Sequence, residues 1–247
     1  MTDAVMPTQE YYLETPDIET SSDDYATRFA GKVGDWFLKV QRDATLKMLK
    51  PYAGATVVDI GGGHGQATEA IIKAGYDLTV FGSDAVCKER IAQFVDSGQC
   101  KFDTGDLLNL PYPDNAFDVV LSYRLLPHID QWPRLIEEMS RIARKAVILD
   151  YPEKRSVNVI APKLFKFKKQ MEGNTRPFTL FSRAEVTEEF NKYNYQFVDA
   201  YAEFFLPMVL HRKLKQPAIS SAAEAVCRAL GLTSLFGSPV IVKYTRR

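Results

Sequence analysis

Residues 56–68 read TVVDIGGGHGQAT, and this stretch decides the fold of the chain. Its first part, TVVDI, is a short apolar run rich in β-branched side chains, which is typical of a buried strand. A turn with four glycines follows, and from Gln66 onward apolar residues recur at helical spacing. Glycines let a backbone approach a ligand closely, and the first N–H groups of a helix point at it. The order strand, glycine turn, helix therefore predicts a nucleotide or cofactor site.

The spacing of the glycines separates the possible ligands. A dinucleotide-binding turn has the pattern G-x-G-x-x-G/A. Counted from Gly61 its last position is Gln66, and counted from Gly63 it is Thr68, so neither count fits. The pattern that fits is D-x-G-x-G-x-G, made by Asp59, Gly61, Gly63 and Gly65.

In this pattern the chain resembles the class I S-adenosylmethionine (SAM) dependent methyltransferases. The resemblance implies that the loop wraps the methionine and ribose part of SAM and that Asp59 lies beneath it. A glycine-rich turn in another kind of α/β protein is the alternative.

A second acid, Asp84, follows the next predicted strand, residues 78–82, and lies 19 residues after Gly65. In nucleotide-binding folds an acid about 20 residues past the glycine turn holds the ribose hydroxyls. We therefore expect Asp84 to bind the ribose of the cofactor. Capping of a helix predicted through residues 86–95 is the alternative role.

A third acid, Asp106, follows a short predicted strand over residues 100–102 and is followed by Leu107. The resemblance implies that an acid here accepts the adenine amino group and that the apolar residue beside it helps to form the adenine pocket. Asp103 is a local competitor, and the family's pattern G-D-hydrophobic favours Asp106.

Residues 110–122 read LPYPDNAFDVVLS, a turn followed by a strand with the apolar composition of one buried on both faces. This block resembles the L-P-[FY]-x-D-x-x-F-D-x-V pattern of small-molecule methyltransferases. Residues 122–125 then read SYRL, so the tetrapeptide of enzymes that methylate nucleobase amino groups, Asn/Asp-Pro-Pro-aromatic, is missing. We assign Ser122 as a cofactor contact, and Tyr123 and Tyr151 as substrate contacts.

The N-terminal 50 residues are predicted to form an arm and a helical lid. Residues 1–24 are polar and acidic, and a short helix carrying Tyr25 and Arg28 follows. A longer helix with apolar residues at helical spacing ends where Lys50 meets Pro51. The resemblance implies that this segment covers the SAM pocket. Tyr25 and Arg28 are therefore candidates for contact with the cofactor or substrate, with core packing as the alternative for the helical stripe.

Residues 51–247 are predicted to form one Rossmann-like α/β domain, on which the N-terminal segment packs. The resemblance implies a seven-stranded, mostly parallel sheet with helices on both faces and an antiparallel last strand. Helical cap insertions are expected near residues 152–181 and 207–237, where a substrate cap would lie. Ser182 and Glu185 form an S-x-x-E pair, which predicts a capping box at a helix start.

The chemistry of methyl transfer limits what the sequence can reveal about catalysis. The displacement occurs at an activated sulfonium, so an enzyme mainly aligns the acceptor and excludes water, and it needs a general base only for a protonated acceptor. His128 follows the fourth predicted strand at the ligand-binding edge and is the candidate catalytic base, with a structural role at a helix start as the alternative. His64 lies in the glycine loop, and His211, beside Arg212 and Lys213, is expected on a solvated face.

Composition excludes several other classes of protein. Lys+Arg and Asp+Glu both number 31, so no overall charge favours nucleic acid. No segment approaches the ~20 apolar residues of a membrane span. Cys87, Cys100 and Cys227 lack the spacing of a metal site or disulfide framework, which is typical of a reducing compartment. We therefore expect a cytoplasmic protein without a metal site or a nucleic-acid partner.

Residues 154–171 hold six basic side chains and no acid, with apolar residues between them. This pattern predicts either an ordinary solvated face or a weak contact with an anionic membrane surface.

Together these features favour a SAM-dependent methyltransferase that acts on a small, apolar or aromatic acceptor. The overall resemblance is to the quinone-, sterol- and natural-product-modifying enzymes, with specific motifs over residues 51–151. Two other classes stay open. One is a methyltransferase-like protein that binds SAM without transferring a methyl group, and the other is a nicotinamide-dependent oxidoreductase, which the glycine spacing disfavours.

Overall fold

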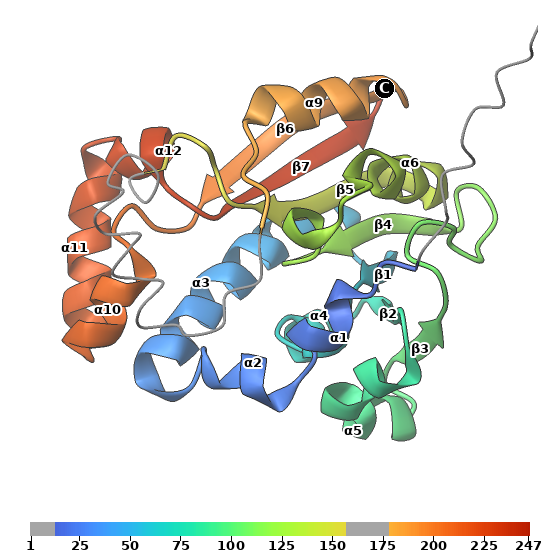
Figure 1. Ribbon diagram of the computed structural model, residues 1–247, viewed down its shortest axis with the longest axis horizontal. Helices are drawn as coiled ribbons and strands as arrows, with labels where there is room; N and C mark the ends of the chain where they lie inside the picture. Colours follow the sequence, from blue (N-terminus) through green and yellow to red (C-terminus); the bar gives the residue numbers. More distant parts are fainter. Residues whose placement is uncertain (1–12, 157–177) are drawn as a thin grey trace, which may run out of the picture.

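A seven-stranded sheet forms the centre of the molecule in the computed structural model, which describes residues 13–156 and 178–247 (Figure 1). The strands are β1 (Thr56–Ile60), β2 (Asp77–Gly82), β3 (Lys101–Thr104), β4 (Phe117–Ser122), β5 (Ala143–Tyr151), β6 (Tyr195–Ala202) and β7 (Val240–Arg246). Their order across the sheet is β3-β2-β1-β4-β5-β7-β6. The strands from β3 to β5 pair in parallel, and β7 pairs antiparallel with both β5 and β6. The predicted fold class, including the antiparallel last strand, is confirmed.

Helices cover both faces of this sheet. They are α1 (Pro16–Thr20), α2 (Asp23–Thr27), α3 (Gly31–Leu49), α4 (Thr68–Lys73), α5 (Ala92–Asp96), α6 (Trp132–Ile142), α9 (Arg183–Asn191), α10 (Met208–Leu214), α11 (Pro217–Ala229) and α12 (Leu232–Phe236). The described residues also form the 3-10 turns η1 (Lys50–Tyr52), η2 (Gly62–His64), η3 (Ala85–Ile91) and η4 (Leu126–His128).

The strands are apolar on both sides because each side meets a helix layer. Val58 and Val120 enter the half of the core that contains α6 and α9, whereas Val57 and Val119 enter the half that contains α3 and α4. Successive residues of one strand point to opposite faces, so a strand covered on both faces has little place for polar residues. The continuous apolar runs of the sequence follow from this arrangement.

The chain changes its winding direction at β1, because β2 lies on one side of β1 and β4 on the other. In open α/β sheets ligands bind beyond the carboxyl ends of the strands at such a switch point. Here β1 runs into the glycine turn η2, and β4 ends at Ser122. The Ser122 hydroxyl donates to the carbonyl of Ile60 at 3.1 Å, so the ends of the two strands are held side by side.

Several local expectations are refined by the structure. In place of one helix through residues 86–95, η3 is followed by the short α5. Helix α6 passes into β5 without a turn, since Ile142 ends the helix and Ala143 begins the strand. The capping box is confirmed, with the N–H of Ser182 donating to Glu185 at 2.8 Å.

The two predicted insertions differ in what the structure describes. The second, near residues 207–237, is built of α10, α11 and α12, which lie together at one end of the molecule next to α3 (Figure 1). Most of the first, residues 157–177, lies outside the described residues, as does most of the basic segment 154–171. Within residues 13–156 and 178–247, none of the helices is long and apolar enough to cross a membrane.

Candidate functional site

The glycine turn bends sharply at two positions that favour glycine. Gly61 has φ +74° and Gly65 has φ +70°, both in the left-handed region. Between them, a Cβ atom on Gly62 would lie 2.3 Å from the carboxylate of Asp59. The turn therefore folds directly over the end of β1 and leaves no room for a side chain above Asp59.

Asp59 is the most unusual group at this edge. Its side chain is fully buried, and neither carboxylate oxygen has a hydrogen-bond partner among the residues that the structure describes. Burial, and in second place the nearby charge of Asp150, raise the pKa of Asp59 to about 7. A buried carboxyl without partners destabilises the fold, so its presence points to a ligand that supplies the missing donors.

Two further carboxyls join Asp59 at the same end of the sheet, and we call the three the buried acid cluster. Asp150 lies near the end of β5, and Glu203 follows β6; both are almost fully buried. Burial raises the pKa of each, to about 8 in Glu203, and the charge of Arg124 opposes the shift in both. The cluster therefore favours binding of a positively charged group.

Arg124 is the cation that faces this cluster. It sits just after β4 with φ +58°, in the left-handed region, and its own N–H donates to Asp150 at 2.6 Å. Its guanidinium donates to Gln66 at 2.8 Å and to Gln41 at 3.0 Å, and lies 4.2 Å from the ring centre of Phe29. One side chain thus connects the turn after β1, helix α3 and the N-terminal segment.

His64 is a weak base, because its surroundings disfavour the protonated ring. Burial, followed by the charge of Arg124, lowers the pKa of His64 to about 3. Its Nδ1 accepts from the N–H of Gln66 at 3.2 Å, which assigns the ring proton to Nε2. The ring is therefore neutral and offers an N–H donor.

The predicted ribose and adenine acids lie after β2 and β3, at the same edge of the sheet. Asp84 is exposed and caps η3, because its Oδ1 accepts from the N–H of Val86 at 2.9 Å. The capping role weighed for this residue is thus present, and its ribose role stays a prediction. Asp106 is half-buried and accepts from the N–H of Leu108, while Leu107 beside it is fully buried.

The competitor of Asp106 is already engaged elsewhere. Asp103 accepts from the hydroxyl of Tyr112 at 2.7 Å. Asp106 therefore remains the candidate for the adenine amino group.

Residues 13–30, which we call the N-terminal strap, bind across this edge through their acids. Glu14 accepts from the N–H groups of Asp130 and Gln131 at 2.6 and 2.9 Å, where α6 begins. Asp17 is fully buried and accepts from both the N–H and the hydroxyl of Ser83, just after β2. The strap thus spans from the end of β2 to the start of α6.

The strap also packs on the glycine turn. A Cβ atom on Gly63 would lie 2.5 Å from the hydroxyl of Ser21. Tyr25 is nearly buried, with the Arg28 guanidinium 4.8 Å from its ring centre, and Arg28 also lies 3.9 Å from Glu19. The cover over the site that the sequence predicts is therefore held by specific contacts, whereas contact of Tyr25 or Arg28 with a ligand stays a prediction.

The predicted substrate contacts are more deeply buried than the candidate base. Tyr123 is fully buried and its hydroxyl is 2.7 Å from that of Thr45 on α3. Tyr151 is also fully buried, at the end of β5, with Phe181 at a ring distance of 6.0 Å. His128 ends η4 beyond β4 and is half-buried.

The expectation for His211 is wrong. Its ring is fully buried, and Nε2 lies 3.0 Å from a carboxylate oxygen of Glu224. Trp36 and Phe37 of α3 and Phe204 surround it at ring distances of 5.2, 5.9 and 6.0 Å. The basic neighbours suggested solvent, but α10 turns this one position toward α3.

The sequence alone did not identify Gln41, Arg124 or Glu203 as parts of the site. Arg124 could have been suspected, since it follows the fourth strand directly. Gln41 lies inside a helix and Glu203 follows an edge strand, and no local pattern marks either of them.

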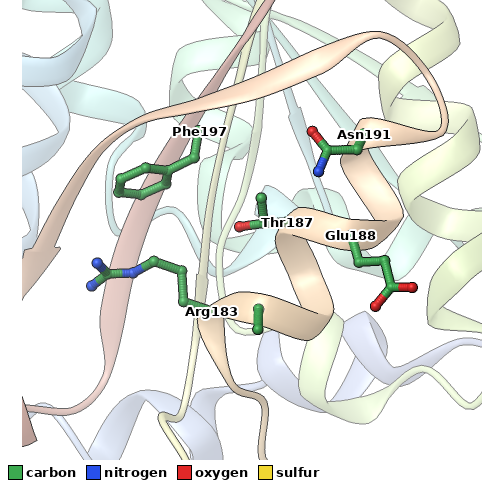
Figure 2. A pocket seen from close by; sticks show the side chains of 6 residues that line it. Arg183, Thr187, Glu188, Asn191 and Phe197 are labelled. Atoms are coloured by element: carbon green, nitrogen blue, oxygen red, sulfur yellow. The ribbon is translucent and has the colours of Figure 1, made fainter.

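A separate depression of about 450 Å³ lies between α9 and β6 (Figure 2). Its walls are formed by Arg183, Ala184, Thr187, Glu188, Asn191 and Phe197. The strands β4, β5 and β7 separate it from the glycine turn. None of the predicted site residues lines it, so it is distinct from the candidate site.

Comparison with known proteins identifies the domain around the glycine turn. A family model described as a methyltransferase domain matches residues 58–149. Ajmaline N-methyltransferase from Rauvolfia serpentina is 36% identical over 93 residues, which cover 35% of this chain and 32% of that protein. 2-phytyl-1,4-naphtoquinone methyltransferase from Nostoc punctiforme is 27% identical over 134 residues, 49% of this chain and 58% of the relative. The chain thus matches less than two thirds of the length of these relatives.

Solved structures share the fold over most of the chain. Magnesium protoporphyrin IX methyltransferase from Synechocystis PCC 6803, with bound S-adenosylhomocysteine (SAH), has a TM-score of 0.63 and 14% identity, covering 91% of this chain and 93% of that one. A [4+2]-cyclase has a TM-score of 0.58 and 19% identity, covering 83% of this chain and 79% of the other. At this level of identity the likeness shows the fold alone.

Proposed function

Because the chain belongs to the class I SAM-dependent methyltransferases, we propose that it transfers the methyl group of SAM to a small organic acceptor. The observation that carries this proposal is Asp59, a buried carboxylate under the glycine turn whose oxygens have no partner among the described residues. A ligand with cationic groups would satisfy it, and SAM carries both an ammonium and a sulfonium.

The residues of the site fit the whole cofactor in their chemistry. The buried acid cluster would favour the cationic part of SAM, whereas Arg124 with Gln66 would suit its carboxylate. Asp84 would hold the ribose hydroxyls, and Asp106 would accept from the adenine amino group. Bound SAM supplies an activated methyl group, and the protein has to orient the acceptor and keep water out.

The N-terminal strap supports the exclusion of water. It binds to the start of α6 and to the end of β2, and so crosses the edge at which the cofactor would lie. Phe29 adds an apolar ring beneath Arg124. A closed strap would therefore separate the reacting atoms from solvent.

An apolar or aromatic acceptor is the second part of the proposal. At the end of β5, Tyr151, Phe181 and Trp132 form a series of ring contacts at 6.0 and 5.2 Å. Two relatives are named for acting on ajmaline and on a phytyl naphthoquinone, which are largely apolar molecules. His128, on the same edge, is the candidate base for an acceptor that must lose a proton.

Titration calorimetry with SAH, SAM and NADPH tests which cofactor the protein binds. SAH and SAM should bind and NADPH should not. Absence of binding by both sulfur compounds would contradict the proposal, and tight NADPH binding would favour an oxidoreductase.

Methyl transfer itself needs a second measurement. SAM with a radiolabelled methyl group should label members of a panel of amines, phenols and quinols, with SAH as the other product. SAM binding without label transfer to any of them would favour the non-catalytic alternative. This measurement is needed because one structure with the same fold is a [4+2]-cyclase, and a fold alone does not determine the reaction.

A further inference from the structure

Helix α11 turns its apolar side to solvent. Ile219 and Val226 of this helix are 57% and 60% exposed, and Leu230, directly after its last residue, is 69% exposed. Exposed alanines continue the same stripe: Ala218, Ala222, Ala225 and Ala229. Residues at this spacing lie along one side of a helix, which in a surface helix is normally the buried side.

Polar residues occupy the inner side of α11 and fix its orientation. Glu224 is buried and accepts from the N–H groups of Phe205 and Leu206 at 2.9 and 2.8 Å. The same carboxylate contacts His211, and Arg228 donates to the carbonyls of Ala202 and Glu203. Rotation of α11 to bury its apolar stripe would break all of these bonds.

Exposed apolar residues also occur on α10 and α12, the two helices that contact α11 at this end of the molecule. We define the α11 surface as Leu210, Leu214, Ile219, Val226, Leu230 and Leu235, each at least 40% exposed. These are six of the ten large apolar side chains that are exposed in the described part of the chain. Such a concentration of exposed apolar groups marks an interaction surface.

Within the segment that carries the α11 surface, the exposed charges have one sign. Residues 206–237 contain Arg212, Lys213, Lys215 and Arg228, and one acid, Glu224, which is buried. Lys213 and Lys215 are exposed. The surface therefore presents apolar and cationic side chains to solvent without an exposed carboxylate.

The exposed apolar and cationic side chains distinguish between two possible partners of this surface, a second copy of the protein and a membrane. In a symmetric dimer the same patch meets itself, which would bring the cations of both copies together. An anionic lipid layer offers acyl chains for the apolar residues and negative headgroups for the lysines. We propose that the α11 surface docks the protein on the anionic face of a membrane.

The position of the surface links docking to the candidate site. Arg228 of α11 donates to the carbonyl of Glu203, whose carboxyl belongs to the buried acid cluster. A membrane bound at α11 would thus lie at the end of the molecule where β6 leads into the site. The docking inference itself does not depend on the proposed reaction.

Flotation with liposomes tests this proposal on the full chain. Vesicles of phosphatidylcholine alone and of phosphatidylcholine mixed with phosphatidylserine are compared at low and at high salt. Binding to the anionic vesicles should be at least tenfold stronger than to the neutral ones, and salt should weaken it. Absent binding, or equal binding to both kinds of vesicle, would overturn the proposal.

Two variants separate the apolar from the cationic contribution. The triple variant Ile219→Ser, Val226→Ser, Leu230→Ser should lose at least tenfold in vesicle binding. The double variant Lys213→Glu, Lys215→Glu should lose binding to anionic vesicles. Circular dichroism and thermal melting establish that both variants fold, and SAH calorimetry should be unchanged in both.

Matched controls change residues of the same kind elsewhere on the surface. Leu13, Val86 and Val198 are exposed apolar residues outside the α11 surface, and Lys32 and Lys50 are exposed lysines on or next to α3. Substitution of the three apolar residues by serine, or of the two lysines by glutamate, should change vesicle binding by less than twofold from the wild type. Equal losses in controls and test variants would overturn the proposal.

Light scattering in the absence of lipid tests whether a second copy of the protein binds to the α11 surface. The protein should have the mass of one chain at concentrations where it binds vesicles. A dimer that the triple serine variant converts to a monomer would assign the α11 surface to a second copy and overturn membrane docking.

Discussion

The backbone N–H of Arg124 donates to the carboxylate of Asp150 at 2.6 Å, and this bond joins the carboxyl ends of β4 and β5. Arg124 has a left-handed backbone, which is uncommon outside glycine. The Asp150 carboxylate thus stabilises the left-handed backbone of Arg124, which directs its guanidinium toward Gln41 and Gln66.

Removal of this acceptor should destabilise the fold. In Asp150→Ala the N–H of Arg124 loses its partner in a partly buried setting, which costs about 1–3 kcal/mol of unfolding free energy. Asp150→Asn keeps an oxygen in place and should lose less. Urea denaturation of both variants measures the difference, and equal losses would show that the bond contributes little.

The stability of the ligand-free protein should fall as the pH rises from about 5 to about 8. The pKa of an unfolded Asp or Glu is near 4, whereas burial raises that of Asp59 to about 7 and that of Glu203 to about 8. Within this window the unfolded chain has released protons that the folded chain still holds, so unfolding is favoured as pH increases.

Asp59→Asn should flatten this pH dependence. Thermal melts at several pH values compare it with the wild type, and Asp77→Asn, at the exposed start of β2, serves as the control. A wild-type melting temperature that stays constant over the window would contradict the raised pKa values.

Asp84→Ala should weaken SAH binding roughly tenfold or more, because a hydrogen bond to a charged acceptor is worth about 1.5–3 kcal/mol. Asp77→Ala removes an acid from the other end of the same strand and should leave the affinity unchanged. Calorimetry of the three proteins gives the comparison. Unchanged affinity in Asp84→Ala would leave this residue with the capping bond to Val86 alone.

Asp17→Ala should open the N-terminal strap. The N–H and hydroxyl of Ser83 lose their shared acceptor, which should lower the unfolding free energy by about 1–3 kcal/mol. Limited proteolysis should then cut within residues 13–30 faster than in the wild type. Asp24→Ala, an exposed acid of α2, is the control, and equal cutting of the two variants would contradict the anchoring role.

His128→Ala should lower kcat by about 10²–10⁴-fold with little change in SAM affinity, if the acceptor found in the panel must lose a proton. Steady-state kinetics and calorimetry on one preparation separate the two effects. A variant with most of its rate would return His128 to a structural role, with Tyr123→Phe and Tyr151→Phe as the next variants.

The strand, turn and helix around Asp59 could be predicted from the sequence because their signals are local. Glycine spacing, β-branched runs and acids at strand ends are all visible within a few residues. The parallel order of the strands then brings Asp59, Asp84 and Asp106 to one edge, as the register of β1, β2 and β3 shows.

The rest of the site depends on contacts between distant parts of the chain. Asp17 meets Ser83 across 66 residues, and Arg124 meets Gln41 across 83. No periodicity marks either partner. The error at His211 has the same origin, since its cationic neighbours indicated solvent while the packing of α10 on α3 buried the ring.

The contact between the N-terminal strap and Cys87 makes the reactivity of this cysteine depend on the strap. The Cys87 thiol is fully buried and donates to Asp17, and burial, followed by the charge of Asp17, raises its pKa to about 11. The thiolate is the form that alkylating reagents attack, so the closed strap protects this cysteine twice, by shielding it and by keeping it protonated. Mass spectrometry can follow alkylation of this one peptide over time. The rate of that reaction therefore measures how often the Cys87 thiol becomes accessible to the reagent.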